Sequence, residues 1–103
     1  MIVFINMKTL KSIKEIISKN KRLLEQQYKV KVIGIFGSYS RGEYFKRSDI
    51  DILVEFSESP DFFEFIRLEK FLENLLGIKV DLVTRKALKP LIKTEILKET
   101  IYI

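Results

Sequence analysis

The sequence predicts a fold of the α/β class, at its border with α+β, in which helices pack on one small mixed β-sheet. Three short apolar runs rich in β-branched residues are typical of strands, and segments with helical spacing of apolar residues stand before, between and after them. The chain has 103 residues, 47% of them hydrophobic, which is enough for one core. We therefore expect a single domain over residues 1–103.

The first expected element is a helix over residues 8–28. Its apolar residues fall near helical spacing, and lysines occupy much of the remainder. Residues 1–31 hold eight lysines and arginines against two acids, a balance of +6. Such a segment suits phosphate-rich partners, and a lysine-rich helix face in contact with solvent fits the same pattern.

The next elements are two strands joined by a polar link. Residues 31–36 (KVIGIF) and 50–56 (IDILVEF) have the composition of buried strands. Between them, residues 38–46 are polar and contain Gly42, which predicts a turn leading into a short helix. Because the link is short, we expect the two strands to be antiparallel.

A helix should begin at Ser59-Pro60, with Ser59 as its cap and Pro60 in its first position, and end at Gly77. A third strand follows over residues 79–84 (KVDLVT), parallel to the second because a helix connects them. The last helix should run from Pro90 to about Glu99. The sheet then has three or four strands.

Three aspartates carry the candidate chemistry. Asp49 and Asp51 stand two apart at the mouth of an apolar strand, so alternation sends both carboxylates to one face. Asp81 lies between Val80 and Leu82 and joins the pair if its strand is a neighbour. Two carboxylates this close need a cation or a shared proton, and oxygen ligands suit Mg²⁺ or Mn²⁺. Taken singly, each aspartate also fits a turn cap or a solvated strand position.

A candidate phosphate site precedes the aspartates. Gly37 ends the first strand and Ser38 follows it, so backbone N–H groups and the Ser38 hydroxyl could receive an anion. Arg41, one turn further on, could pair with the same phosphates, and Gly42 permits a close approach.

Composition excludes several classes of site and mechanism. The chain contains neither Cys nor His, which excludes disulfides, Cys/His zinc sites, cysteine nucleophiles and histidine bases. It has no apolar run approaching the ~20 residues of a spanning helix and no signal-peptide pattern. We therefore expect a cytoplasmic protein without a membrane partner.

Gly37-Ser38, ten residues, then Asp49-x-Asp51 resembles the G-S-x10-D-x-D signature of the DNA polymerase β-like nucleotidyltransferase superfamily. The fuller run, GSYSRGEYFKRSDIDILV, is similar to the minimal nucleotidyltransferase branch, and Asp81 stands where that family keeps its third carboxylate. The resemblance covers about residues 30–84 and implies the polymerase-β-like fold.

The resemblance also implies residue roles. Asp49, Asp51 and Asp81 would be catalytic and hold Mg²⁺, as two ions, with Mn²⁺ as the alternative. Asp81 would also help to deprotonate the acceptor hydroxyl. Gly37 and Ser38 would bind the triphosphate of ATP, and Arg41 matches a motif position whose contact differs among members. AMP would pass to a hydroxyl and pyrophosphate would leave.

The minimal branch is similar to antitoxins that transfer AMP to a tyrosine of a HEPN toxin encoded beside them, which implies such a toxin as partner. Apolar positions in the last helix (Leu91, Ile92, Ile96) and residues 101–103 could form the contact surface, or pack in the core or fray at the chain end. Non-catalytic occlusion of the partner and transfer to a small molecule or an RNA end are the alternatives. We do not expect a nucleic-acid partner.

Overall fold

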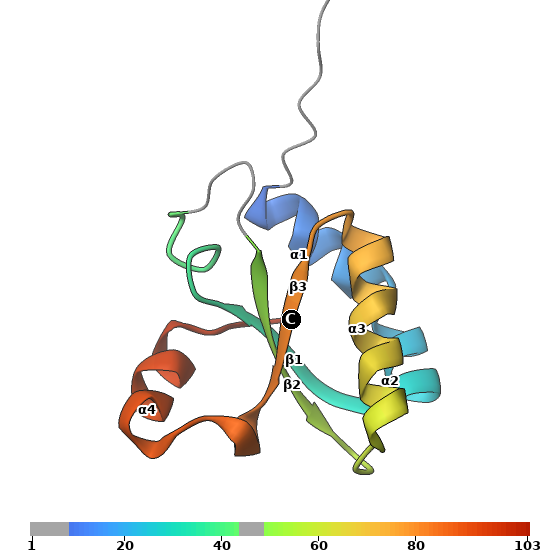
Figure 1. Cartoon of the computed structure of the whole chain (residues 1–103). Helices are drawn as coiled ribbons and strands as arrows, with labels where there is room; N and C mark the ends of the chain where they lie inside the picture. Colours follow the sequence, from blue (N-terminus) through green and yellow to red (C-terminus); the bar gives the residue numbers. More distant parts are fainter. Residues whose placement is uncertain (1–8, 44–48) are drawn as a thin grey trace, which may run out of the picture.

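The computed structural model describes residues 9–43 and 49–103. In chain order its elements are α1 (Leu10–Lys19), α2 (Lys21–Tyr28), β1 (Val30–Phe36), β2 (Ile50–Phe56), α3 (Phe62–Leu76), β3 (Val80–Thr84), the short 3-10 helix η1 (Arg85–Ala87), α4 (Pro90–Glu99) and β4 (Ile101–Tyr102). The sheet is the middle layer of three: α1, α2 and α3 cover one face and α4 covers the other (Figure 1).

The four strands form one mixed sheet in the order β3-β2-β1-β4. β1 is antiparallel to both β2 and β4, whereas β2 and β3 are parallel. This confirms the mixed sheet, the antiparallel first pair and the parallel pair joined by a helix. The register places Asp51 beside Asp81.

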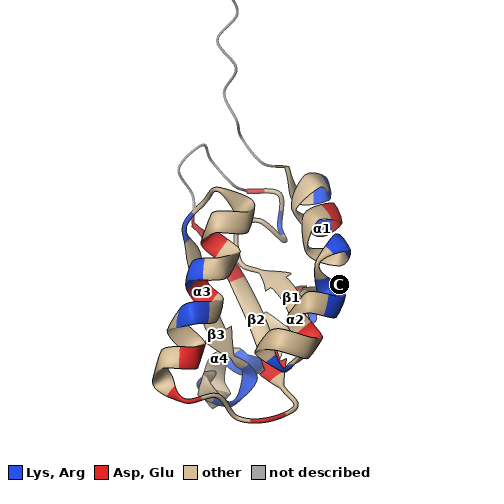
Figure 2. Ribbon diagram, turned by 90° about the vertical axis from the view of Figure 1, so that its right-hand side faces the viewer, with Lys and Arg blue, Asp and Glu red and all other residues tan. Residues whose placement is uncertain are grey.

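The N-terminal helical segment is two helices, so the prediction of one helix over residues 8–28 is wrong in its continuity, and residue 8 lies outside the described residues. The break is at Asn20, whose backbone leaves the helical region and whose side-chain Nδ2 donates to the Ile16 carbonyl at 2.8 Å. A side-chain amide that bonds the backbone locally competes with the helical ladder. Basic residues line α1 in Figure 2, as its lysine content predicts.

The start of α3 differs from its predicted start at Ser59-Pro60. Asp61 caps the helix: its carboxylate accepts from the Glu64 N–H at 2.7 Å, and the Glu64 side chain accepts from the Asp61 N–H at 2.9 Å. This reciprocal capping box satisfies two N–H groups that a cap at Ser59 would leave open. The predicted end is confirmed, because Gly77 adopts a left-handed φ of 71° there.

Strand alternation divides the apolar side chains into two cores. Ile50, Ile52 and Val54 of β2 face the larger core under α1, α2 and α3. Leu53 belongs to the smaller core with Phe36 and Leu88, on the side covered by α4. Asp51, like Leu53 an odd-numbered position of β2, belongs to the α4 side of the sheet.

The C-terminal apolar residues divide between packing and exposure. Ile96 packs against the smaller core, Ile101–Tyr102 pairs with β1, and Ile103 packs against the larger core. For Ile96 and Ile103 the alternative of core packing is therefore confirmed. Leu91 is 95% exposed and Ile92 49% exposed, in the first turn of α4. In the described ranges, 9–43 and 49–103, no helix is long and apolar enough to cross a membrane.

Glu73 ties α3 to the strand that carries Asp81. Its carboxylate accepts from the Val80 N–H at 3.0 Å, and this hydrogen bond, with a smaller contribution from Lys70, lowers the pKa of Glu73. A carboxyl group whose pKa is lower in the folded protein stabilises it above the unfolded pKa, near 4.3, and less as pH falls.

We expect Glu73→Ala to lower the free energy of unfolding at pH 7 by about 1 kcal/mol, because the Val80 N–H loses its partner. In Glu73→Gln, urea unfolding should show a smaller loss of stability between pH 5 and pH 3 than in the wild-type protein. An equal loss in the two proteins would contradict this assignment.

Candidate functional site

Two of the three predicted aspartates meet at the β2–β3 edge. Asp51 and Asp81 are register partners on these parallel strands, and the Asp81 carboxyl group lies close enough to raise the pKa of Asp51. Asp51 is half-buried and Asp81 is exposed. Asp49 precedes β2, is exposed, and acts on Asp51 through its charge. The structure therefore brings Asp51 and Asp81 into contact, with Asp49 nearby in the chain.

Burial and like charge act together on Asp51. Burial is the larger cause that raises its pKa to about 6, followed by the charge and hydrogen bond of Asp81 and then by the charge of Asp49. Arg41 acts in the opposite direction. A carboxyl group in these surroundings is costly to ionise, and a cation beside it would remove that cost.

Gly37 lies against the Asp51 carboxylate. Its φ is 72°, a left-handed conformation that a side chain disfavours. A Cβ placed there would overlap Asp51 Oδ2 and stand 3.0 Å from Asp51 Cγ. The position requires glycine for two independent reasons, and the turn after β1 and the carboxylate pair form one site.

The described part of the link from Gly37 to Glu43 is a series of turns. The predicted turn is therefore confirmed, no helix follows it within the described residues up to Glu43, and residues 44–46 of the predicted segment lie outside the described part of the chain. The N–H groups of Ser40 and Arg41 both donate to the Gly37 carbonyl, at 3.1 and 3.2 Å. Gly42 then adopts a φ of 72°, which ends the helical direction.

Ser38 lies second in this turn and is half-buried, and its carbonyl accepts from the Glu43 N–H at 2.8 Å. This bond closes the turn back on itself next to the carboxylate pair. Gly37 and Ser38 are thus at the edge of the site, as the sequence predicts, but on a turn and without a helix N-terminus behind them.

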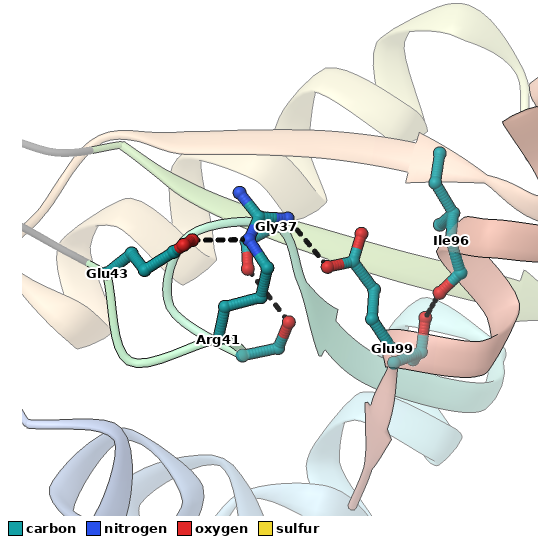
Figure 3. Close-up of polar contacts among 7 residues, drawn as sticks. Gly37, Arg41, Glu43, Ile96 and Glu99 are labelled. Atoms are coloured by element: carbon teal, nitrogen blue, oxygen red, sulfur yellow. Dashed lines mark hydrogen bonds and ion pairs between the residues drawn. The ribbon is translucent and has the colours of Figure 1, made fainter.

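Arg41 is held by two acids (Figure 3). Its Nε donates to Glu43 at 2.8 Å, and its Nη1 donates to Glu99, at the end of α4, at 2.7 Å. Both hydrogen bonds raise the pKa of Arg41. Sequence reasoning did not identify Glu99, since it lies 58 residues away and belongs to no local motif.

The donor set fits a hard divalent cation. Asp51 and Asp81 offer oxygen ligands on adjacent strands, and burial together with the neighbouring Asp81 raises the pKa of Asp51, so a cation there would relieve the cost of ionising it. The sequence predicts a cluster of three carboxylates. Among residues 9–43 and 49–103 no group of three or more acidic side chains lies close enough to hold a metal ion. Asp51 and Asp81 are therefore the two carboxylates that lie together and could hold the cation.

Comparison with known sequences identifies the family. Residues 10–103 match the family model described as the nucleotidyltransferase domain. A candidate protein adenylyltransferase of Methanocaldococcus jannaschii is 55% identical over 98 residues, which are 94% of this chain and 100% of that protein. The protein adenylyltransferase MntA of Thermococcus cleftensis is 46% identical over 97 residues, covering 94% of this chain and 98% of that protein.

Solved structures agree with this assignment. A structure described as a candidate minimal nucleotidyltransferase matches with a TM-score of 0.80 and 31% identity, over 93% of this chain and 97% of that one. A chain of a toxin–antitoxin structure with AMP-PNP matches with a TM-score of 0.66 and 25% identity, over 92% of this chain and 72% of that one. A chain from the structure of the tri-AMPylated Shewanella oneidensis HEPN toxin in complex with MNT antitoxin matches with a TM-score of 0.62 and 25% identity, over 87% of this chain and 70% of that one. The chain therefore belongs to the nucleotidyltransferase domain family, within its minimal branch, and has the polymerase-β-like fold.

Proposed function

We propose that this nucleotidyltransferase transfers AMP from ATP to a hydroxyl of a partner protein, a tyrosine of a HEPN toxin, and so acts as the antitoxin of the pair. The observation that carries the proposal is the contact between Asp51 and Asp81 beside the Gly37 turn. The relatives named as protein adenylyltransferases, and the toxin–antitoxin structures among the neighbours, support the protein acceptor.

In this proposal Asp49 and Asp51 hold Mg²⁺ and Asp81 completes the ligand set, with Mn²⁺ as an alternative ion. When bound, the metal neutralises charge on the transferred phosphate. Gly37 and Ser38 receive the triphosphate, and Arg41 adds a positive charge at the same end of the sheet. Asp81, the exposed member of the pair, accepts the proton of the tyrosine hydroxyl. The tyrosine oxygen then bonds to the α-phosphorus of ATP as the bond from that phosphorus to pyrophosphate breaks and pyrophosphate leaves.

The proposed partner surface is the first turn of α4. Leu91 and Ile92 are exposed there, and Tyr102 of β4 is 50% exposed. Exposed apolar side chains on a small domain are typical of protein contacts. A partner bound at this surface would supply the acceptor half of the site.

The direct test uses ATP labelled at either end. Wild-type protein, Mg²⁺ and the toxin encoded beside it should transfer label from α-labelled ATP to the toxin and none from γ-labelled ATP. The Asp49→Ala variant should transfer neither label. Transfer from γ-labelled ATP, or undiminished α-label with Asp49→Ala, would contradict the proposal.

Occlusion is the second candidate, because the exposed α4 residues need no carboxylate to bind a partner. It predicts that Asp51→Ala still protects cells from the toxin, whereas our proposal predicts that this variant forms the complex and fails to protect.

A further inference from the structure

Arg41 is engaged by acids from two distant parts of the chain. Glu43 is two residues along the same turn, whereas Glu99 is the last residue of α4. In Figure 3 the guanidinium group lies between the two carboxylates, next to the labelled Gly37. The Arg41–Glu99 ion pair therefore joins the Gly37 turn to α4 across the smaller core.

The two acids differ in how firmly they are held. The Glu43 side chain is 58% exposed and lies on a turn, whereas the Glu99 side chain is 24% exposed. The end of α4 is fixed by Thr100, whose N–H and hydroxyl both donate to the Ile96 carbonyl, at 3.0 and 2.6 Å. Ile96 itself packs against the smaller core. Glu99 is therefore the more buried partner of Arg41 and stands at a helix end held by hydrogen bonds, whereas Glu43 is the more exposed partner.

Nη2 is the guanidinium nitrogen of Arg41 that neither acid engages. The group has five N–H donors in a planar fork, and the two acids engage Nε and Nη1. Within the ranges that the structure describes, no hydrogen bond from Nη2 is seen (Figure 3). Because the fork is planar, fixing Nη1 also fixes the direction of Nη2. The Arg41 backbone N–H donates to the Gly37 carbonyl at 3.2 Å, which places Arg41 at the site.

We propose that Glu99 is a positioning residue that orients Arg41 so that its remaining N–H groups meet a phosphate of the nucleotide bound beside Gly37. The inference rests on the proposed function, because it assigns Glu99 as the residue that holds Arg41 in the proposed nucleotide site. A role in stability alone is insufficient to explain the pair, since Arg41 is 49% exposed and exposed ion pairs add little to folding. If Glu99 only neutralised Arg41, removing it would strengthen nucleotide binding, which is the opposite effect.

The test is a double-mutant cycle on the dissociation constant of a non-hydrolysable ATP analogue with Mg²⁺, measured by calorimetry. Glu99→Ala and Arg41→Ala should each weaken binding about tenfold, as expected for a charge-assisted contact. The double variant should bind as Arg41→Ala does, because Glu99 acts only through Arg41. Glu99→Gln keeps an acceptor and should fall between Glu99→Ala and the wild type. Glu95→Ala, an exposed acid one turn earlier on α4, is the control and should bind as the wild type does.

Three results would overturn the inference: additive losses in the double variant, tighter binding by Glu99→Ala, or unchanged binding by it. Thermal unfolding of each variant shows whether a loss of analogue binding comes from misfolding. Losses of binding that come from misfolding would add up in the double variant. Wild-type protein that binds no analogue would overturn the inference and the proposed function together. Wild-type binding without AMP transfer would overturn the proposed function alone, and the cycle would still decide the role of Glu99.

Discussion

Asp51→Asn is expected to abolish AMP transfer and, in metal-free buffer, to stabilise the folded protein. Because Asp51 is one of the proposed metal ligands, its removal should lower the rate at least about 100-fold. The stability gain follows from the pKa of Asp51, which burial and Asp81 raise to about 6 in the folded protein. In the unfolded chain the pKa is near 3.9, so ionisation costs more in the folded state.

The sign of this effect depends on pH. A carboxyl group with a raised folded pKa leaves stability unchanged below about pH 4, destabilises the fold progressively between pH 4 and 6, and does so fully at pH 7. Discounted for solvent screening, the gain from Asn at pH 7 is about 1–2 kcal/mol. Urea unfolding with EDTA at pH 7 and pH 4 measures it.

Glu58→Gln, an exposed acid beyond the other end of β2, is the control and should change stability little at either pH. Added Mg²⁺ should stabilise the wild-type protein and not Asp51→Asn, since only the wild type presents the charged pair. A loss of stability in Asp51→Asn at pH 7, or an equal gain at pH 4, would show that the carboxylate pair is not strained.

Gly37→Ala is the second change with a large expected effect. Its Cβ would require a strained left-handed φ and would overlap Asp51 Oδ2. We expect a loss of about 1–3 kcal/mol in the free energy of unfolding and at least a tenfold loss of AMP transfer, because Asp51 must move.

Gly42→Ala is the matched control, since Gly42 has the same φ of 72° in the same turn and its added Cβ meets nothing within 4 Å. It should show the backbone strain alone, with AMP transfer near the wild-type rate. In an Asp51→Ala background, Gly37→Ala should cost no more stability than Gly42→Ala. Equal effects of the two substitutions in the wild-type background would show that the contact with Asp51 is unimportant.

The sequence predicts the strands well because burial determines them. Residues 31–36, 50–56 and 79–84 are short apolar runs rich in β-branched residues, a pattern typical of buried strands. The helix between the last two runs makes those two strands parallel. That pairing is why the contact between Asp51 and Asp81 could be predicted without coordinates. The cap at Asp61 was missed because Ser59-Pro60 has an equally favourable start signal, and only hydrogen-bond geometry separates the two.

The features that the sequence could not predict depend on side chains meeting across the fold. Glu99 has no motif, and its contact with Arg41 exists only because α4 ends beside the Gly37 turn. β4 has two residues, too few for a period-2 pattern, and becomes a strand by pairing with β1. The break at Asn20 depends on one local hydrogen bond within a segment whose apolar spacing is helical throughout.

The most direct measurement is the intact mass of the proposed HEPN toxin partner, after co-expression with the wild type and with Asp49→Ala/Asp51→Ala. We expect the toxin to gain one or more AMP units with the wild type and none with the double variant, and we expect fragmentation to place the AMP on a tyrosine. A toxin of unchanged mass in a stable complex with the wild-type protein would contradict the claim that the carboxylate site transfers AMP to its partner.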